Sequence, residues 1–203
     1  MDDPLSYEAS LWNNGILRIA GLDEVGRGSL AGPVVAAVVV LPQGGVVEGA
    51  GDSKKISRRK REQLYDEILR EALEVQFGSA SAQEIDKTNI LLATGLAMKR
   101  ALDQLAEQPD HVVIDGLPMA SLGWEHDAVV KGDAKVHSIG CASIVAKVFR
   151  DRLMIDLGEQ YPGYGWDHNA GYGTKEHRDA LERIGLTPYH RKTFLGKQYG
   201  LGI

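Results

Sequence analysis

Four carboxylates stand beside glycines where predicted strands come to an end: Asp23, Glu24, Asp115 and Asp133. In open α/β sheets, sites are assembled at strand ends because segments that are distant in the sequence meet there. Clustered carboxylates repel one another, so such a cluster persists when cations neutralise it. Oxygen ligands of this kind select Mg²⁺ or Mn²⁺. Two such ions, about 4 Å apart, can activate a water and stabilise the leaving oxygen of a phosphodiester.

A plainer interpretation remains open for each of these acids, namely a strand-end cap or a solvated surface residue. The neighbours Asp23 and Glu24 raise a geometric difficulty, because adjacent residues of a strand point to opposite faces. They share a site only where the strand bends or ends. Gly26 and Gly28 follow directly and allow such a bend.

The glycine-rich segment GRGSLAGP occupies residues 26–33. Glycine lets the backbone approach a ligand closely, and Arg27 can reach a phosphate. The segment lacks the lysine and serine that end a nucleotide-binding phosphate loop, and a predicted strand follows it in place of a helix. We therefore interpret it as a contact loop and disfavour a nucleotide site of that kind.

The charge distribution is uneven along the chain. The net charge of −5 argues against nucleic acid as a partner, because phosphate binding normally leaves a basic footprint. Between residues 54 and 61, however, six of eight residues are Lys or Arg. A locally basic face on an acidic protein fits a nuclease whose metal ligands are themselves carboxylates.

Chain length and cysteine content limit the number of domains and the kinds of disulfide or zinc site that the protein can have. A chain of 203 residues favours one domain with a substantial core. The single cysteine, Cys141, excludes an intramolecular disulfide and a thiolate-rich zinc site, and its apolar neighbours favour a packing role. The histidines show no zinc-binding spacing. No secretory signal is evident, and the longest apolar run, 34–41, is too short to span a membrane. We expect a cytoplasmic monomer without membrane contact.

The elements that must position these residues follow from hydrophobic periodicity and capping patterns. Strands are predicted at 16–25, 33–41, 75–80, 111–116 and 128–130, the first two as a hairpin. Helices are predicted from the cap Ser57, from a capping box at Ser81, and over 88–106, 138–157 and 174–184. Strands that later alternate with helices predict a mixed α/β sheet covered on both faces.

Eight sequence blocks together resemble the ribonuclease HII family in order and spacing from about residue 16 to residue 194. They are GLDEVGRGSLAGPVVAAVVV, DSKKIS, VVIDG, KGDAK, ASIVAKVFRDRLM, YPGYG, GYGTKEH and HRKTF. The chain departs from the family pattern at Ser29, where proline is frequent, and at 137–141 and 166–169. The last departure replaces a more basic stretch and bears on the path of the duplex.

The resemblance implies a ribonuclease H-like mixed central sheet flanked by helices, with a small C-terminal helical extension. Residues 1–157 would form the catalytic domain, and residues 158–203 an extension packed on it. The implied enzyme is a ribonuclease H that hydrolyses the RNA strand of RNA/DNA hybrids and incises 5′ to ribonucleotides embedded in duplex DNA. The implied mechanism uses two Mn²⁺ or Mg²⁺ ions and leaves 3′-hydroxyl and 5′-phosphate ends.

Matching the motifs residue by residue implies roles for individual side chains. The catalytic and metal-binding acids of the family fall on Asp23, Glu24, Asp115 and Asp133. The elements that sense the ribose fall on Gly26, Arg27, Gly28 and Tyr172, which fits because the 2′-hydroxyl separates RNA from DNA. We expect phosphate contacts from Ser53, Lys54, Lys55, Arg191 and Lys192, with a solvated basic face as the plainer interpretation. Lys147, Arg150 and Asp151 are expected to orient neighbours.

Two other functions were weighed against the nuclease. A nucleic-acid-binding module that lost its chemistry is disfavoured, because buried negative charge near phosphate would only weaken binding. A sister enzyme that prefers long RNA/DNA hybrids usually carries an extra N-terminal domain, and only about fifteen residues precede the first predicted strand. The nuclease therefore remains the favoured hypothesis.

Overall fold

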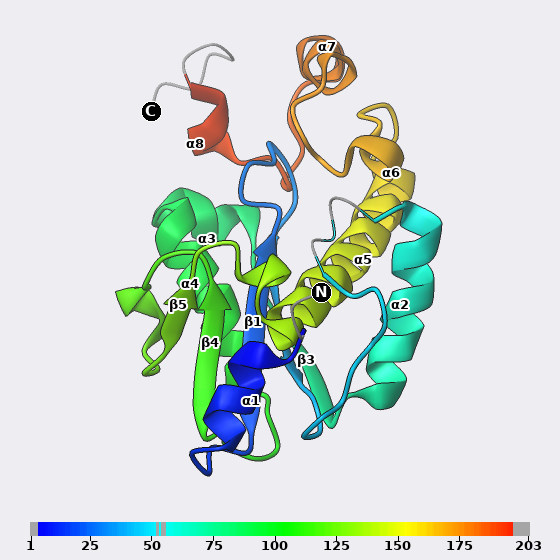
Figure 1. The fold of residues 1–203 in the computed structure, drawn as a ribbon. Coiled ribbons are helices and arrows are strands. Elements are labelled where there is room, and N and C mark those ends of the chain that lie inside the picture. The colour runs from blue at the N-terminus through cyan, green and yellow to red at the C-terminus, as the bar shows by residue number, and fades with distance from the viewer. Residues whose placement is uncertain (1–3, 52, 54–55, 197–203) are drawn as a thin grey trace.

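The computed structural model describes residues 4–51, 53 and 56–196, which fold around a five-stranded mixed sheet (Figure 1). The strands lie in the order β3-β2-β1-β4-β5. Their bounds are β1 (Ile19–Val25), β2 (Val34–Val40), β3 (Glu74–Ala80), β4 (His111–Asp115) and β5 (Asp127–Val129). The first three pair antiparallel, whereas β4 runs parallel to β1 and β5 parallel to β4. The predicted hairpin and the predicted mixed sheet are confirmed.

Helices cover both faces of this sheet. The helices are α1 (Ser6–Trp12), α2 (Arg58–Glu71), α3 (Ala82–Lys87), α4 (Ile90–Leu102), α5 (His137–Gln160), α6 (Trp166–Asn169), α7 (Lys175–Ile184) and α8 (Lys192–Leu195). Figure 1 shows α3 and α4 on one side of the sheet and α2 and α5 on the other. Within the described residues, no helix combines the length and the apolar character that crossing a bilayer requires.

Strand β2 explains why the sheet needs both layers. All of its residues are buried. Val38 and Val40 pack into the core cluster beneath α4, and Ala37 and Val39 pack into the cluster beneath α2 and α5. A strand that is apolar on both faces is stable only when both faces are covered.

Local capping fixes the starts of two helices as predicted. The Ser57 side chain accepts a hydrogen bond from the backbone N–H of Lys60 and begins α2. Ser81 and Glu84 form a capping box that begins α3. Each such cap contributes about 1 kcal/mol, because it satisfies backbone donors that the first helical turn leaves free.

The segment after α5 packs against the glycine-rich loop that joins β1 to β2. Its core contains Trp166, Leu181 and Leu195, which contact Met154 of α5 and Ala31 of the loop. Gly171 O also accepts hydrogen bonds from the backbone N–H groups of Leu30 and Ala31. The C-terminal segment is therefore tied to the loop by both apolar packing and backbone hydrogen bonds.

Candidate active site

One pocket of about 360 Å³ collects the four predicted acids. It is lined by Asp23, Glu24, Val25, Ser53, Asp115, Asp133, Ser143, Lys147 and Tyr172. These residues come from β1, the segment before α2, β4, the turn that precedes α5, α5 itself and the segment before α7. The fold therefore brings together side chains that are as far apart in sequence as Asp23 and Tyr172.

The sheet register sets two of the acids side by side. Strand β1 is paired with the parallel strand β4, with Leu22 opposite Ile114. The next residue of each strand is therefore an acid, Asp23 on β1 and Asp115 at the end of β4. Since the two strands run in the same direction, both carboxylates lie where the β1–β4 pairing ends and on the same face of the sheet.

Asp133 reaches the pocket by a different route from the one predicted. The prediction that it ends a strand is wrong: β5 stops at Val129, and Asp133 lies in a short 3₁₀ turn, Gly132–Ala134. Lys131 enters this turn with a left-handed backbone, at φ 59°. Gly132 N donates a 2.6 Å hydrogen bond to Asp115 Oδ1, which couples the turn to the end of β4.

The adjacent acids Asp23 and Glu24 are both held by short local contacts. Glu24 N donates a 2.7 Å hydrogen bond to Asp23 Oδ1, and Arg27 Nη1 lies 3.1 Å from Glu24 Oε1. Strand pairing continues through Val25 opposite Val35, so β1 does not end before these acids. The bend comes at Gly26, which has φ +90°.

Burial and mutual repulsion destabilise the ionised forms of the pocket acids Asp23 and Glu24. Burial, followed by repulsion from Glu24 and Asp115, raises the pKa of Asp23 well above its ordinary value. Burial also raises the pKa of Glu24, which Arg27 partly opposes. Such shifts record charge that the protein's own cations do not fully compensate.

The donor set suits a hard divalent cation. Among the described residues, no three His, Cys, Asp or Glu side chains converge closely enough to form a finished metal site. Three of the carboxylates instead accept hydrogen bonds from the protein itself. Asp23 accepts from Glu24 N, Glu24 accepts from Arg27, and Asp115 accepts from Gly132 N. Carboxylate oxygens are the ligands that Mg²⁺ and Mn²⁺ prefer, and a cation would relieve the repulsion that raises the Asp23 pKa. The chemistry of the donor set therefore fits such ions.

Two buried arginines hold the glycine-rich loop. Arg150 donates to the carbonyl oxygens of Pro33, Ala31 and Ala170 and to Ser29 Oγ. This arrangement agrees with the prediction that Arg150 orients its neighbours. It also accounts for Gly26, since a Cβ at that position would overlap the Arg150 guanidinium.

Arg191 is the second of these arginines, and the prediction that it contacts phosphate is corrected. Its side chain is fully buried. The guanidinium donates to the carbonyl oxygens of Gly26 at 2.7 Å, Arg27 at 2.7 Å and Gly32 at 2.9 Å. Because its donors are turned toward the backbone, Arg191 supports the loop and does not face a ligand.

Tyr172 faces the loop from the other side. Its side chain is partly exposed, and a Cβ added at Gly28 would lie 4.0 Å from Tyr172 Cε1. The Arg150 guanidinium lies 5.8 Å from the centre of the Tyr172 ring. Of the three predicted loop residues, Gly28 therefore lies close to this ring, Arg27 contacts Glu24, and Gly26 packs against Arg150.

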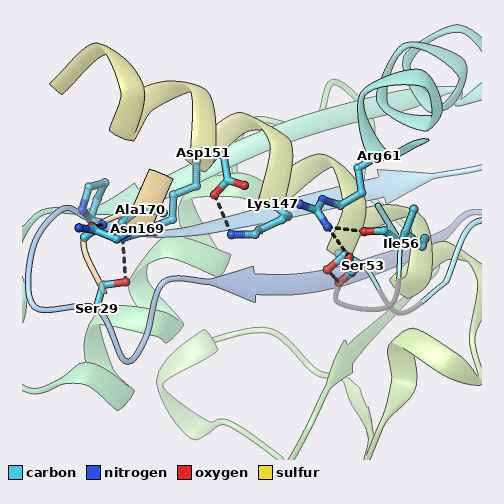
Figure 2. A network of polar contacts seen from close by, with 12 residues as sticks. Ser29, Ser53, Ile56, Arg61, Lys147, Asp151, Asn169 and Ala170 are labelled. Carbon is cyan, nitrogen blue, oxygen red and sulfur yellow. Dashed lines mark hydrogen bonds and ion pairs between the residues drawn. The ribbon is translucent and has the colours of Figure 1, made fainter. Parts of the chain in front are cut away.

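The segment before α2 is tied down by Arg61, as Figure 2 shows. Arg61 Nη1 donates to the carbonyl oxygens of Ser53 and Ile56. Ser53 is buried, and its hydroxyl lies 2.9 Å from the Ser143 hydroxyl. Lys54 and Lys55, predicted to contact phosphate, lie outside the described residues.

Sequence reasoning missed Ser143 as a pocket residue. Ser143 and Lys147 are four residues apart on α5, so both face the pocket. Lys147 Nζ lies 2.7 Å from Asp151 Oδ1, so this ammonium is paired with an acid of its own helix (Figure 2). The serine could have been found from this helical spacing relative to the lysine.

Comparison with known proteins agrees on one family. The family model for Ribonuclease HII matches residues 20–197. A Ribonuclease HII of Ruegeria pomeroyi is 56% identical over 188 residues, covering 92% of this chain and 80% of the relative. A Ribonuclease HII of a Synechococcus strain is 53% identical over 193 residues, covering 94% of this chain and 87% of the relative.

Solved structures agree with this fold. The ribonuclease H2 from Pyrococcus horikoshii OT3 superposes with a TM-score of 0.74 at 26% identity, covering 87% of this chain and 93% of that one. Bst-RNase HIII in complex with Mn²⁺ shares the fold, with a TM-score of 0.68 at 17% identity over 92% of this chain and 70% of that one. The chain therefore belongs to the ribonuclease HII family and is a metal-dependent endoribonuclease that acts on RNA/DNA hybrids.

Proposed function

We propose that this enzyme incises duplex DNA on the 5′ side of an embedded ribonucleotide, as well as the RNA strand of hybrids, and leaves 3′-hydroxyl and 5′-phosphate ends. Asp23, Glu24, Asp115 and Asp133 hold two Mg²⁺ or Mn²⁺ ions for this reaction. The observation that carries the proposal is that the four acids and Tyr172 line a single pocket.

The four acids approach the proposed metal site from different structural elements. When bound, the divalent ions supply an activated water and stabilise the leaving oxygen. Asp23 and Asp115, side by side where the β1–β4 pairing ends, supply two neighbouring carboxylates. Asp133 approaches from the turn before α5, and Glu24 from β1, where Arg27 contacts it. Strands and a 3₁₀ turn carry these acids, so their backbones are in place before substrate arrives and only side chains remain to be ordered around the ions.

The loop 26–28 and Tyr172 recognise the ribose of the ribonucleotide. Gly26 and Gly28 leave the loop backbone without side chains, and Gly28 lies close to the Tyr172 ring. The backbone N–H groups of the loop can donate to a 2′-hydroxyl, and Arg27 can reach a neighbouring phosphate. The partly exposed Tyr172 ring offers a flat face on which a sugar or base can rest. A deoxyribose lacks the group that this surface would contact, which gives the selectivity for a ribonucleotide.

Phosphate contacts hold the duplex beside this pocket. Ser53, Lys54 and Lys55 precede α2, and the exposed Arg58 and Arg59 begin it. The Lys and Arg residues of this stretch lie next to one another in the sequence, and such a basic run attracts a phosphate backbone despite the net charge of −5. Ser53 itself lines the pocket and so contacts the phosphate nearest the acids.

We also propose that residues 158–203 act as an extension of the catalytic domain 1–157. Support comes from the core that the segment after α5 shares with Met154 and Ala31. The boundary falls inside α5, which runs to Gln160, so the two parts are joined by continuous helix. The extension would therefore carry Tyr172 to the loop as part of one folding unit.

A DNA duplex that contains one ribonucleotide tests the proposal. We expect a cut on the 5′ side of the ribonucleotide when Mg²⁺ or Mn²⁺ is added, and none after chelation. An all-DNA duplex of the same sequence is the control and should remain intact. A cut on the 3′ side, or cleavage without divalent metal, would refute the proposed chemistry.

A further inference from the structure

A pair of buried histidines lies behind Tyr172, away from the acids. His177 is fully buried, and His190 is nearly so. Their Nε2 atoms are 3.0 Å apart. His177 Nδ1 lies 3.0 Å from the carbonyl oxygen of Tyr172. The family motifs contain both histidines, but the chemistry described above uses neither.

The hydrogen-bond partners fix where the protons lie. Thr187 N donates to His190 Nδ1 at 2.9 Å, so the proton of a neutral His190 lies on Nε2 and is donated to His177 Nε2. Trp166 Nε1 also donates to His177 Nε2, at 3.1 Å. His177 therefore carries its proton on Nδ1 and donates it to Tyr172 O. Burial, the first cause for both rings, lowers their pKa and keeps them neutral.

This chain of bonds ends at the residue whose ring borders the pocket. Tyr172 N donates to Asn169 O, so the tyrosine backbone is held at both its amide and its carbonyl. Thr174 Oγ1 accepts from His177 N, which places the histidine in the first turn of α7. Tyr172 O also accepts a 2.8 Å hydrogen bond from Thr174 N. His177 thus adds a side-chain donor to the backbone bonds that set the position of Tyr172 opposite Gly28.

We propose that His177, whose tautomer His190 is sufficient to fix, is a positioning residue that holds Tyr172 against the Gly26-Arg27-Gly28 loop. This inference rests on the proposed function, in which Tyr172 packs on the ribose. It adds a specificity-determining element that never touches the substrate. A displaced Tyr172 would still leave the acids and the phosphate contacts intact, so turnover falls while substrate affinity is retained.

Two substitutions of His177 distinguish the role of Nδ1 from the role of Nε2. His177→Asn keeps an amide donor near the position of Nδ1, facing Tyr172 O, and loses the acceptor for Trp166. His177→Gln keeps a polar group near the position of Nε2 and loses the donor to Tyr172 O. Trp166→Phe is the matched control, because it removes a buried hydrogen bond to the same ring on the side away from Tyr172.

The assay measures kcat and KM on a DNA duplex with one ribonucleotide, alongside the thermal unfolding temperature of each variant. We expect His177→Gln to lower kcat about tenfold or more with little change in KM, because a small misplacement of a positioning group is costly. We expect His177→Asn to stay within about threefold of the parent and Trp166→Phe to match the parent, although all three unfold at lower temperature.

Combination with Tyr172→Ala completes the test. If His177 acts through Tyr172, the double variant Tyr172→Ala/His177→Gln cuts no more slowly than Tyr172→Ala alone. The positioning role is overturned if the rate losses of the two single variants multiply in the double variant. It is also overturned if His177→Asn and His177→Gln lose kcat equally. Neither result contradicts the ribose contact of Tyr172. Full activity of Tyr172→Ala on this duplex overturns the ribose contact itself, and the inference with it.

Discussion

The guanidinium of Arg191 donates a 2.7 Å hydrogen bond to the carbonyl oxygen of Gly26, although 165 residues separate the two in sequence. Further bonds reach Arg27 O and Gly32 O. A guanidinium has donors and no acceptor, so each bond turns a loop carbonyl inward. The C-terminal part of the chain therefore shapes the loop that borders the acids.

Arg191→Lys is expected to lower stability and turnover together. A lysine cannot reproduce the fork that serves three carbonyl oxygens, and unsatisfied buried acceptors cost about 1–3 kcal/mol each. Urea unfolding should show a loss of about 2–3 kcal/mol, whereas the half-exposed Arg27→Ala should change stability by less than about 0.5 kcal/mol. An unchanged unfolding free energy for Arg191→Lys would argue against this supporting role.

Gly28→Ala is expected to lower cleavage without lowering stability, whereas Gly26→Ala is expected to lower stability. A methyl group at Gly28 meets only Tyr172, at an ordinary contact distance, so the fold should be retained while the group blocks the ribose path. At Gly26 the methyl overlaps Arg150, and the φ of +90° disfavours any side chain. Unfolding temperature and cleavage rate, measured for both variants, separate the effects. A Gly28→Ala enzyme with parental turnover would contradict the sugar-sensing role.

Divalent cations are expected to stabilise the fold more at alkaline than at acidic pH. The pKa of Asp23 and that of Glu24 are raised in the folded protein, so their contribution to stability is present at low pH and is lost as pH rises through the raised pKa. A bound cation offsets the repulsion that remains. The gain in unfolding temperature on adding Mg²⁺ should be larger at about pH 8 than at about pH 5.5.

The control for that experiment is Asp23→Asn, which removes the most strongly shifted carboxylate. Its thermal gain from Mg²⁺ should be small, and the dependence of that gain on pH should flatten. An equal gain at both pH values in the parent protein would show that the cations bind elsewhere.

His190 is expected to destabilise the fold on acidification. Burial, with the neighbouring His177, lowers the pKa of His190 to about 4, below the unfolded value of 6.5. The neutral ring therefore contributes stability that is fully present above pH 6.5 and is lost as pH falls toward about 4. His190→Gln should show a weaker fall in unfolding free energy over that window. A parallel fall in both proteins would assign the acid sensitivity to other groups.

Much of the fold followed from local patterns in the sequence. Alternating or continuous apolar runs gave the strands, and the caps Ser57 and Ser81 gave helix starts because capping depends only on residues three positions apart. Helix α1 was not predicted. Its seven residues are held partly by Glu8, whose carboxylate accepts from Ser138 N and Oγ, and such a contact over 130 residues leaves no local pattern.

The errors at the site have the same physical origin. Residues 128–133 resemble a strand that ends in an acid, but the edge strand β5 is only three residues long and Lys131 turns the chain before Asp133. Arg191 looked like a phosphate ligand because its charge is visible in the sequence and its burial is not. Burial of a charged group depends on distant partners, here the carbonyl oxygens of the loop.

Turnover by Asp23→Asn tests the central claim most directly. The substitution keeps the size of the side chain and removes one negative charge from the pocket that Asp23, Glu24, Asp115 and Asp133 share. With Mg²⁺ or Mn²⁺ and a duplex that carries one ribonucleotide, we expect cleavage to fall by a factor of about 10³ or more, with the fold intact and the duplex still bound. Multiple-turnover cleavage near the parental rate by the purified Asp23→Asn protein would contradict the account.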